Sequence, residues 1–191
     1  MRVRWGIGSL VLGFLLISDS GAPAQAPEPE GYRLDDYRAP TPATVPGAVT
    51  VGTEAAYRLW QSGAVVWVDV LPAPRRPENF PPQALWMPMP RRHIPGSLWL
   101  PDVGRGSLSP ELEAYFRTHL EAATEGLRDR PIAFYCLAQC WMSWNAVKRA
   151  ASWGYSHLYW YRDGIDGWEA AELPTEDAEP VPGPLKGNDQ E

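Results

Sequence analysis

The chain has 191 residues and a formal net charge of −6, with an isoelectric point near 5.1. An acidic chain without a cluster of lysine and arginine lacks the basic face that nucleic acid or an anionic membrane would require, so we expect neither as a partner. The length fits one domain with a hydrophobic core of its own.

The N-terminus has the features of a secretion signal. Two arginines in Met1–Arg4 precede the apolar run Gly6–Ile17, and Ala24-Gln25-Ala26 forms a cleavage site of the small-x-small type. The run has about 12 residues, whereas a membrane-spanning helix needs about 20, so we expect a cleaved signal peptide over 1–26. The mature protein is then expected in a bacterial periplasm, with no membrane contact after cleavage. An uncleaved anchor is the alternative.

Two segments flank the expected domain. Residues 27–48 are rich in proline and alanine with scattered charges, and residues 175–191 combine acidic residues with proline. Segments of this composition bury too little apolar area to order themselves. We therefore expect a linker over 27–48, one domain over 49–174 and a disordered acidic tail over 175–191.

Helical and strand patterns alternate between these flanks. The expected elements are a helix over 55–61, a strand over 64–69, a helix after the N-cap Ser109, a strand over 131–135, a helix over 143–153, a strand over 157–161, and a turn over 164–167 before a last helix. Such alternation predicts an α/β fold with a mostly parallel sheet covered by helices on both faces. Functional residues in such a sheet lie beyond the carboxyl ends of the strands.

A long excursion interrupts this alternation. Residues 71–92 are rich in proline and arginine and contain no periodic pattern. Loops of this length are usually functional or disordered. The segment is either a rigid surface insertion or a loop that covers the site or docks a partner.

The two cysteines, Cys136 and Cys140, lie between a predicted strand and a predicted helix. Loop amides and the positive pole of the helix would stabilise a thiolate at Cys136, and a thiolate is the nucleophilic form of cysteine. The thiols of exported proteins are also exposed to an oxidising compartment, and a C-x3-C spacing permits a disulfide within the loop. A buried structural cysteine is the alternative to a reactive one.

Four short motifs follow one another along the chain. They are Val68-Asp69, His93-Ile94-Pro95-Gly96-Ser97, Tyr135-Cys136 and Asp163-Gly164-Ile165-Asp166-Gly167-Trp168. Over residues 49–174 this set resembles the ordered motifs of a rhodanese-like domain, which implies a single domain of that fold with Cys136 as the sulfur-carrying residue. The resemblance also implies supporting, chiefly architectural roles for Asp69 and His93.

The stretch from Tyr135 to Ala146 is similar to the exported PQQ-dependent catabolism-associated CXXCW motif proteins. That similarity implies a role in PQQ-dependent alcohol catabolism, with a PQQ-dependent dehydrogenase, a c-type cytochrome or a transporter as partner. PQQ would act only through such partners, and we expect no cofactor in the chain itself. Three residues separate Cys136 from Cys140, so the two-residue spacing in the family name does not apply here.

The expected active-site loop differs from that of an active sulfurtransferase, which has six residues and usually a basic one. The loop comprises Cys136, Leu137, Ala138, Gln139, Cys140, Trp141 and Met142, and Ser143 opens the next helix. Seven residues is the length in rhodanese-related phosphatases, but no residue from Cys136 to Trp144 is charged. Without charge-assisted hydrogen bonds to an oxyanion, phosphatase activity and efficient use of thiosulfate are both disfavoured. Lys148, Arg149 or an arginine of the 75–92 segment could restore the missing charge.

Other chemistries are less well supported. The three histidines lie far from the cysteines in sequence, so we expect no metal site. Covalent haem is excluded because Trp141, not histidine, follows Cys140. Trp141 itself either shields the sulfur from water or stacks on a planar ligand such as PQQ.

The sequence thus yields two hypotheses. In the first, the protein is a periplasmic rhodanese-like thiol protein that performs sulfur transfer, through a persulfide on Cys136, or thiol redox chemistry, with Cys140 as the resolving thiol. In the second, the rhodanese scaffold is a non-catalytic binding module for a periplasmic dehydrogenase, cytochrome or transporter.

Overall fold

A computed structural model describes residues 25–184 of the chain. All but the last two residues of the expected signal peptide lie outside this range. The central sheet has five strands, which in spatial order are β1 (Val49–Val51), β6 (Leu158–Tyr161), β5 (Ile132–Tyr135), β2 (Val66–Asp69) and β4 (Leu98–Trp99). Every neighbouring pair is parallel. The carboxyl ends of the strands therefore share one edge, and Cys136 directly follows the central strand β5.

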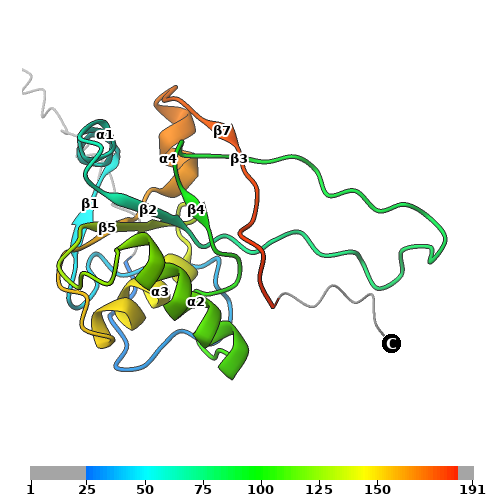
Figure 1. The fold of residues 1–191 in the computed structure, drawn as a ribbon, viewed down its shortest axis with the longest axis horizontal. Coiled ribbons are helices and arrows are strands. Elements are labelled where there is room, and N and C mark those ends of the chain that lie inside the picture. The colour runs from blue at the N-terminus through cyan, green and yellow to red at the C-terminus, as the bar shows by residue number, and fades with distance from the viewer. Residues whose placement is uncertain (1–24, 185–191) are drawn as a thin grey trace, which may run out of the picture.

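Helices cover both faces of this sheet, as the sequence predicts (Figure 1). One face carries α2 (Pro110–Ala123) and α3 (Trp141–Ser152), and the other carries α1 (Thr53–Gln61) and α4 (Gly164–Ala170). Two buried clusters result, one on each side of the sheet. The expected single α/β domain with a mostly parallel sheet is confirmed.

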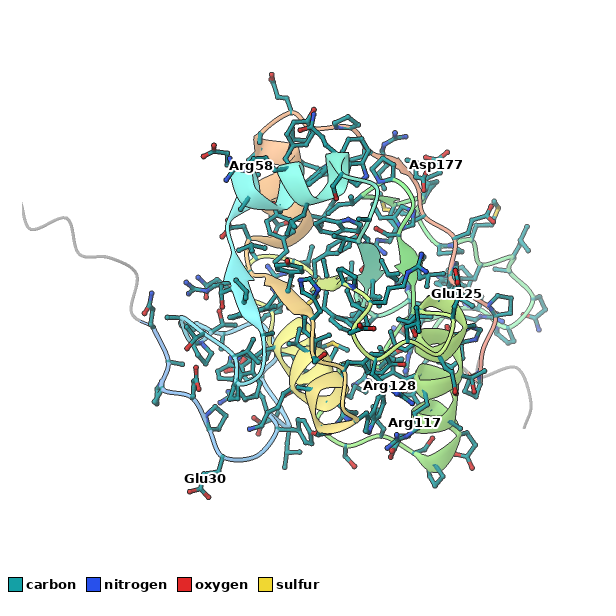
Figure 2. The ribbon with its side chains drawn as sticks, turned by 60° about the vertical axis from the view of Figure 1, so that its left-hand side comes forward. Glu30, Arg58, Arg117, Glu125, Arg128 and Asp177 are labelled. Atoms are coloured by element: carbon teal, nitrogen blue, oxygen red, sulfur yellow. A yellow bond between two sulfur atoms is a disulfide. The ribbon has the colours of Figure 1, made fainter. Side chains whose placement is uncertain are left out.

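The central strands are mostly apolar because both faces of the sheet are covered. In β5, Phe134 packs toward α2 and α3, whereas Ala133 and Tyr135 pack toward α1 and α4. In β2, Val68 likewise packs toward α2 and α3, and Trp67 packs toward α1 and α4. Figure 2 shows the interior filled with side chains, while labelled charged residues such as Arg58 and Glu125 lie at the surface.

The predicted helix boundaries were partly right. At α2, the Ser109 hydroxyl accepts a hydrogen bond from the Leu112 amide, and Pro110 opens the helix as expected. In contrast, α3 begins at Trp141, two residues before the predicted start at Ser143. The side chains of Trp141 and Met142 are buried, so tertiary packing rather than capping preference fixes this start. Both residues belong to the helix and not to the loop.

The segment over 164–167 is also helical. The prediction of a turn there is wrong, because α4 begins at Gly164 and includes those four residues. The buried side chains of Ile165 and Trp168 stabilise this short helix against the sheet.

The C-terminal residues pair with the domain up to the end of the described range. Strand β7 (Glu176–Asp177) forms an antiparallel pair with β3 (Arg92–His93). Further on, the Val181 amide donates to the Trp99 carbonyl over 2.9 Å. Residues 175–184 are thus ordered, unlike the disordered tail we expected, because backbone pairing replaces the apolar burial that they lack. Residues 185–191 lie outside the described part of the chain.

The excursion after β2 projects away from the body of the protein (Figure 1). Its base is fixed where the Trp99 indole donates to the Leu71 carbonyl and Arg75 pairs with the buried Asp102. Beyond that base, Leu85 and Met89 are more than four-fifths exposed. The segment is therefore a surface insertion that does not cover the cysteines. No helix among residues 25–184 has the length and apolar character needed to cross a membrane.

Buried and exposed leucines in the same region test this description of the core. Leu120 of α2 is fully buried, whereas Leu127 just beyond the helix is 53% exposed. We expect Leu120→Ala to lower the free energy of unfolding by about 2–5 kcal/mol, because it leaves a cavity. Leu127→Ala should change it by less than about 0.5 kcal/mol. Urea denaturation measures both values, and equal effects would contradict the assigned core.

Candidate functional site

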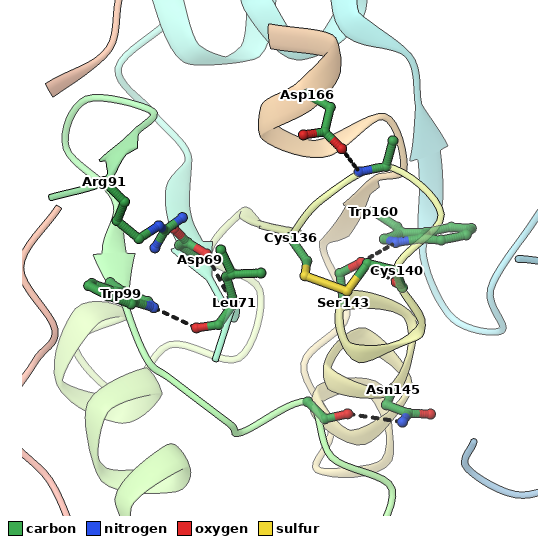
Figure 3. Close-up of a disulfide and its surroundings, with 12 residues drawn as sticks. Asp69, Leu71, Arg91, Trp99, Cys136, Cys140, Ser143, Asn145, Trp160 and Asp166 are labelled. Carbon is green, nitrogen blue, oxygen red and sulfur yellow. Dashed lines mark hydrogen bonds and ion pairs between the residues drawn. A yellow bond between two sulfur atoms is a disulfide. The ribbon is translucent and has the colours of Figure 1, made fainter. Parts of the chain in front are cut away.

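The candidate site is the loop between β5 and α3. Cys136 follows Tyr135 at the end of β5, and Cys140 takes the extended N-cap position of α3. The two residues form a disulfide, with their Cα atoms 6.2 Å apart (Figure 3). This separation lies inside the window of about 4.4–6.8 Å that a disulfide requires. The pairing that the C-x3-C spacing permits is therefore present.

The start of α4 holds this loop in place. The Ile165 amide donates to the Cys136 carbonyl over 2.9 Å. The Ala138 amide donates to the Asp166 carboxylate, also over 2.9 Å (Figure 3). Gly164 allows this approach, because a Cβ at that position would collide with the Cys136 carbonyl and because its φ is +58°. The roles of Gly164 and Asp166 were not foreseen, although both belong to a motif that carries the family resemblance.

The first turn of α3 is locked from two sides. The Ser143 hydroxyl donates to the Cys140 carbonyl and accepts a hydrogen bond from the Trp160 indole, each at 3.0 Å. Trp141 is 2% exposed and packs edge-on against Trp144. The side of the loop formed by this turn is consequently closed, which favours the shielding role for Trp141 over stacking on a planar ligand.

The residues expected to form a linker instead cross this site. We call residues 27–48 the N-terminal strap. The Trp141 amide donates to the Tyr37 carbonyl at 2.9 Å, and the Thr41 amide donates to the Gln139 side-chain oxygen at 3.0 Å. The prediction of a linker failed because side chains of the domain bind the main chain of the strap, which composition alone does not reveal.

Both cysteines of this loop are buried. Cys136 is 0% exposed and Cys140 is 3% exposed. Two of the amides that were expected to stabilise a thiolate at Cys136 have other partners. The Ala138 amide binds Asp166, and the Trp141 amide binds the strap. The loop as folded here is therefore an oxidised and enclosed site.

The cations that could restore charge to the loop already have partners. Arg91, from the excursion, donates to Asp69 at 2.5 Å. Lys148 donates to strap carbonyls, and Arg149 donates to main-chain oxygens of the segment between β4 and α2. Within residues 25–184, no group of three or more His, Cys, Asp or Glu side chains is arranged to hold a metal ion.

Asp69 and His93 form a second cluster at the same sheet edge. Asp69 is fully buried and also accepts a hydrogen bond from the Leu71 amide. The Nδ1 atom of His93 lies 3.9 Å from Asp69, and its Nε2 atom lies 3.3 Å from Glu176. These contacts join β2, β3, β7 and the base of the excursion, which supports the architectural role that the resemblance implies.

Burial dominates the electrostatics of this cluster. It raises the pKa of Asp69 from 3.8 to about 6, although Arg91 opposes the shift, and it lowers the pKa of His93. The folded protein therefore binds a proton at Asp69 more tightly than the unfolded chain does. It follows that the contribution of Asp69 to stability falls as the pH rises from about 4 to 6.

A titration can check this pKa. We expect the carboxyl carbon of Asp69 to titrate in the NMR spectrum with a midpoint near pH 6. Because an asparagine does not titrate, the free energy of unfolding of the wild type relative to that of Asp69→Asn should fall as the pH rises from about 4 to 6. A midpoint below pH 4 would mean that the ion pair with Arg91 outweighs burial.

Comparison with solved structures returns chains of low identity, and three of them are sulfurtransferases by name. A polysulfide-sulfur transferase homodimer from Wolinella succinogenes is 21% identical, covering 70% of this chain and 81% of that one, with a TM-score of 0.44. A human single-domain sulfurtransferase is 23% identical, covering 65% of this chain and 97% of that one, with a TM-score of 0.41. A thiosulfate sulfurtransferase from Pseudomonas aeruginosa is 16% identical over 70% of this chain and 21% of its own, with a TM-score of 0.45.

A search of curated proteins returns no match. The family comparison is more direct. Residues 52–171, well over half of the chain, match the rhodanese-like domain family. This range includes every strand of the central sheet except β1, and it contains the disulfide loop. The chain belongs to the rhodanese-like domain family.

Proposed function

We propose that the protein carries out sulfur transfer or thiol redox chemistry at Cys136, with Cys140 as the resolving thiol. The observation that carries this proposal is the disulfide itself, which joins the residue at the end of β5 to the N-cap of α3. The nucleophile of a parallel α/β fold is expected at this edge of the sheet. A second cysteine within bonding distance gives that nucleophile an intramolecular partner.

The chemistry balances in two steps once the disulfide is reduced. The Cys136 thiolate attacks the outer sulfur of a persulfide donor and becomes a persulfide itself. The rest of the donor leaves as a thiol. The Cys140 thiol then attacks the inner sulfur at Cys136, forming the disulfide and releasing hydrogen sulfide. A dithiol partner resets the site by supplying two electrons and two protons.

The surroundings favour an uncharged sulfur donor. No loop residue is charged, and Arg91, Lys148 and Arg149 are engaged in contacts within the protein. An oxyanion such as thiosulfate would enter without charge-assisted hydrogen bonds, each worth about 1.5–3 kcal/mol. A persulfide donor has no oxyanion group and needs no such hydrogen bonds.

The cellular setting is proposed from the sequence. The N-terminal signal and the similarity to the CXXCW motif proteins support a periplasmic protein that serves PQQ-dependent alcohol catabolism. Its partner would be a PQQ-dependent dehydrogenase, a c-type cytochrome or a transporter, and PQQ would be bound by that partner.

A non-catalytic binding module is the second candidate. It is favoured by the enclosure of both sulfurs, because a disulfide without access to solvent can simply brace a scaffold. The two candidates differ in the reduction potential of the Cys136–Cys140 pair. A value well above about −300 mV indicates a reactive pair, whereas a value far below it indicates a structural one.

The resolving role predicts a specific trapped species. After reduction and treatment with a low-molecular-weight persulfide, Cys140→Ser should retain the fold and accumulate a persulfide on Cys136. The wild type should return to the disulfide, because Cys140 attacks the inner sulfur and expels the outer sulfur as hydrogen sulfide. Intact-mass spectrometry distinguishes the two products.

Cys136→Ser is the matched control, since it keeps one cysteine in the same loop. It should not accumulate a persulfide under the same treatment. Equal labelling of both single-cysteine variants would contradict the assignment of Cys136 as the nucleophile.

Donor choice gives a further test. The reduced wild type should transfer sulfur to cyanide faster from an organic persulfide than from thiosulfate, by about 10-fold or more if one charge-assisted hydrogen bond is missing. The rate with the persulfide should depend only weakly on ionic strength, because no cation of the loop recruits the donor. Rapid turnover of thiosulfate that declines with added salt would show that a cation does reach the loop.

A further inference from the structure

One face of α3 acts as a row of hydrogen-bond donors to the N-terminal strap. The positions 141, 144, 145 and 148 recur at i, i+3, i+4 and i+7, which places them on one side of a helix. The Trp144 indole donates to the Thr44 carbonyl at 3.0 Å, and the Asn145 amide donates to the Arg33 carbonyl at 2.8 Å. This face therefore binds the main chain of the strap.

The two ends of this donor row continue the pattern. The Trp141 amide binds the Tyr37 carbonyl, and the Lys148 ammonium donates to the carbonyls of Pro29 and Gly31. From outside the helix, the Arg162 guanidinium donates to the Thr41 carbonyl at 3.3 Å and to its hydroxyl at 3.1 Å. The strap is thus held as a receptor holds an extended peptide, through its carbonyl oxygens.

The strap adds few fully buried side chains to the protein interior, and they are Thr41, Pro42 and Val45. Tyr37, Ala39 and Ala48 pack against the core but are only partly buried. Leu34, by contrast, is 68% exposed. A segment held chiefly by hydrogen bonds, with few buried apolar contacts, opens at lower free energy than the core elements do.

The same segment contacts the disulfide loop on both sides of Cys140. Tyr37 binds the first amide of α3, next to Cys140, and Thr41 binds the Gln139 side chain within the loop. Gln139 has a φ of +53°, a conformation that is unfavourable for a residue with a side chain. The strap therefore binds the loop while Gln139 is in this unfavourable conformation. In the same conformation of the loop, both cysteines are buried.

We propose that the N-terminal strap is a displaceable cover of the Cys136–Cys140 site, and that a reductant reaches the sulfurs only after the strap has left the donor face of α3. The inference rests on the proposed function, because a cover matters only if the cysteines react. Access to the site is then set by the equilibrium between the bound and the released strap.

The test uses the full chain and removes donors that lie outside the core and outside the loop. Lys148→Met and Arg162→Met each delete a charged donor to the strap, and Arg130→Met is the control because Arg130 pairs with Glu125 instead. Two quantities are measured. One is the rate of disulfide reduction by excess dithiol, followed by alkylation and mass spectrometry. The other is hydrogen exchange at the amides of Thr41 and Trp141.

We expect the double variant to be reduced about 10-fold faster or more, since a hydrogen bond to a charged group contributes about 1.5–3 kcal/mol. Exchange at Thr41 and Trp141 should accelerate by a similar factor, while the β5 amides stay protected and the control behaves like the wild type. A reduction rate within twofold of wild type, despite faster exchange, would overturn the proposal.

Wild-type protein alone offers a second test if the variants fold poorly. The amides of Thr41 and Trp141 should exchange well before those of β5, and exchange of both groups only upon global unfolding would also overturn the proposal. Failure of the proposed function is a separate result. It would appear as the absence of a persulfide in Cys140→Ser, which leaves the measured rate of disulfide reduction unaffected.

Discussion

The position of Cys136 at the end of a strand buried on both faces constrains every other part of the site. The main chain of β5 is fixed by β2 and β6, so the residue after Tyr135 has little freedom. Its carbonyl oxygen must then find a donor, and the first turn of α4 supplies one through Ile165. The glycine at position 164 and the disulfide to Cys140 both follow from this crowded junction.

The cationic side chains around this junction bind other groups of the protein and not the sulfurs. Arg91 enters from the excursion but pairs with Asp69, and Lys148 and Arg149 bind carbonyl oxygens. Each of these cations donates to a buried or partly buried oxygen. Within residues 25–184, Arg91, Lys148 and Arg149 thus bind other groups of the protein and not the loop.

Two proline-rich segments of similar composition have opposite fates in this protein. The N-terminal strap lies against α3, where side chains along one helix face donate hydrogen bonds to its carbonyl oxygens. Residues 71–91 meet no such surface beyond their base and project away from the body (Figure 1). Composition shows that neither segment can build a core of its own. Whether such a segment becomes ordered depends on whether the folded domain has hydrogen-bond donors that bind its main chain.

The sequence by itself determined the α/β class, the central strands and the loop that bears the cysteines, because hydrophobic periodicity and short motifs are local properties of the chain. It also indicated that the loop carries no charge. Only the tertiary structure decided that α3 starts at Trp141, that Asp166 and Gly164 clamp the loop, and that the strap binds the loop on both sides of Cys140. Those features depend on contacts between residues up to about a hundred positions apart, such as Thr41 with Gln139, and such pairings leave no periodic signal in the chain.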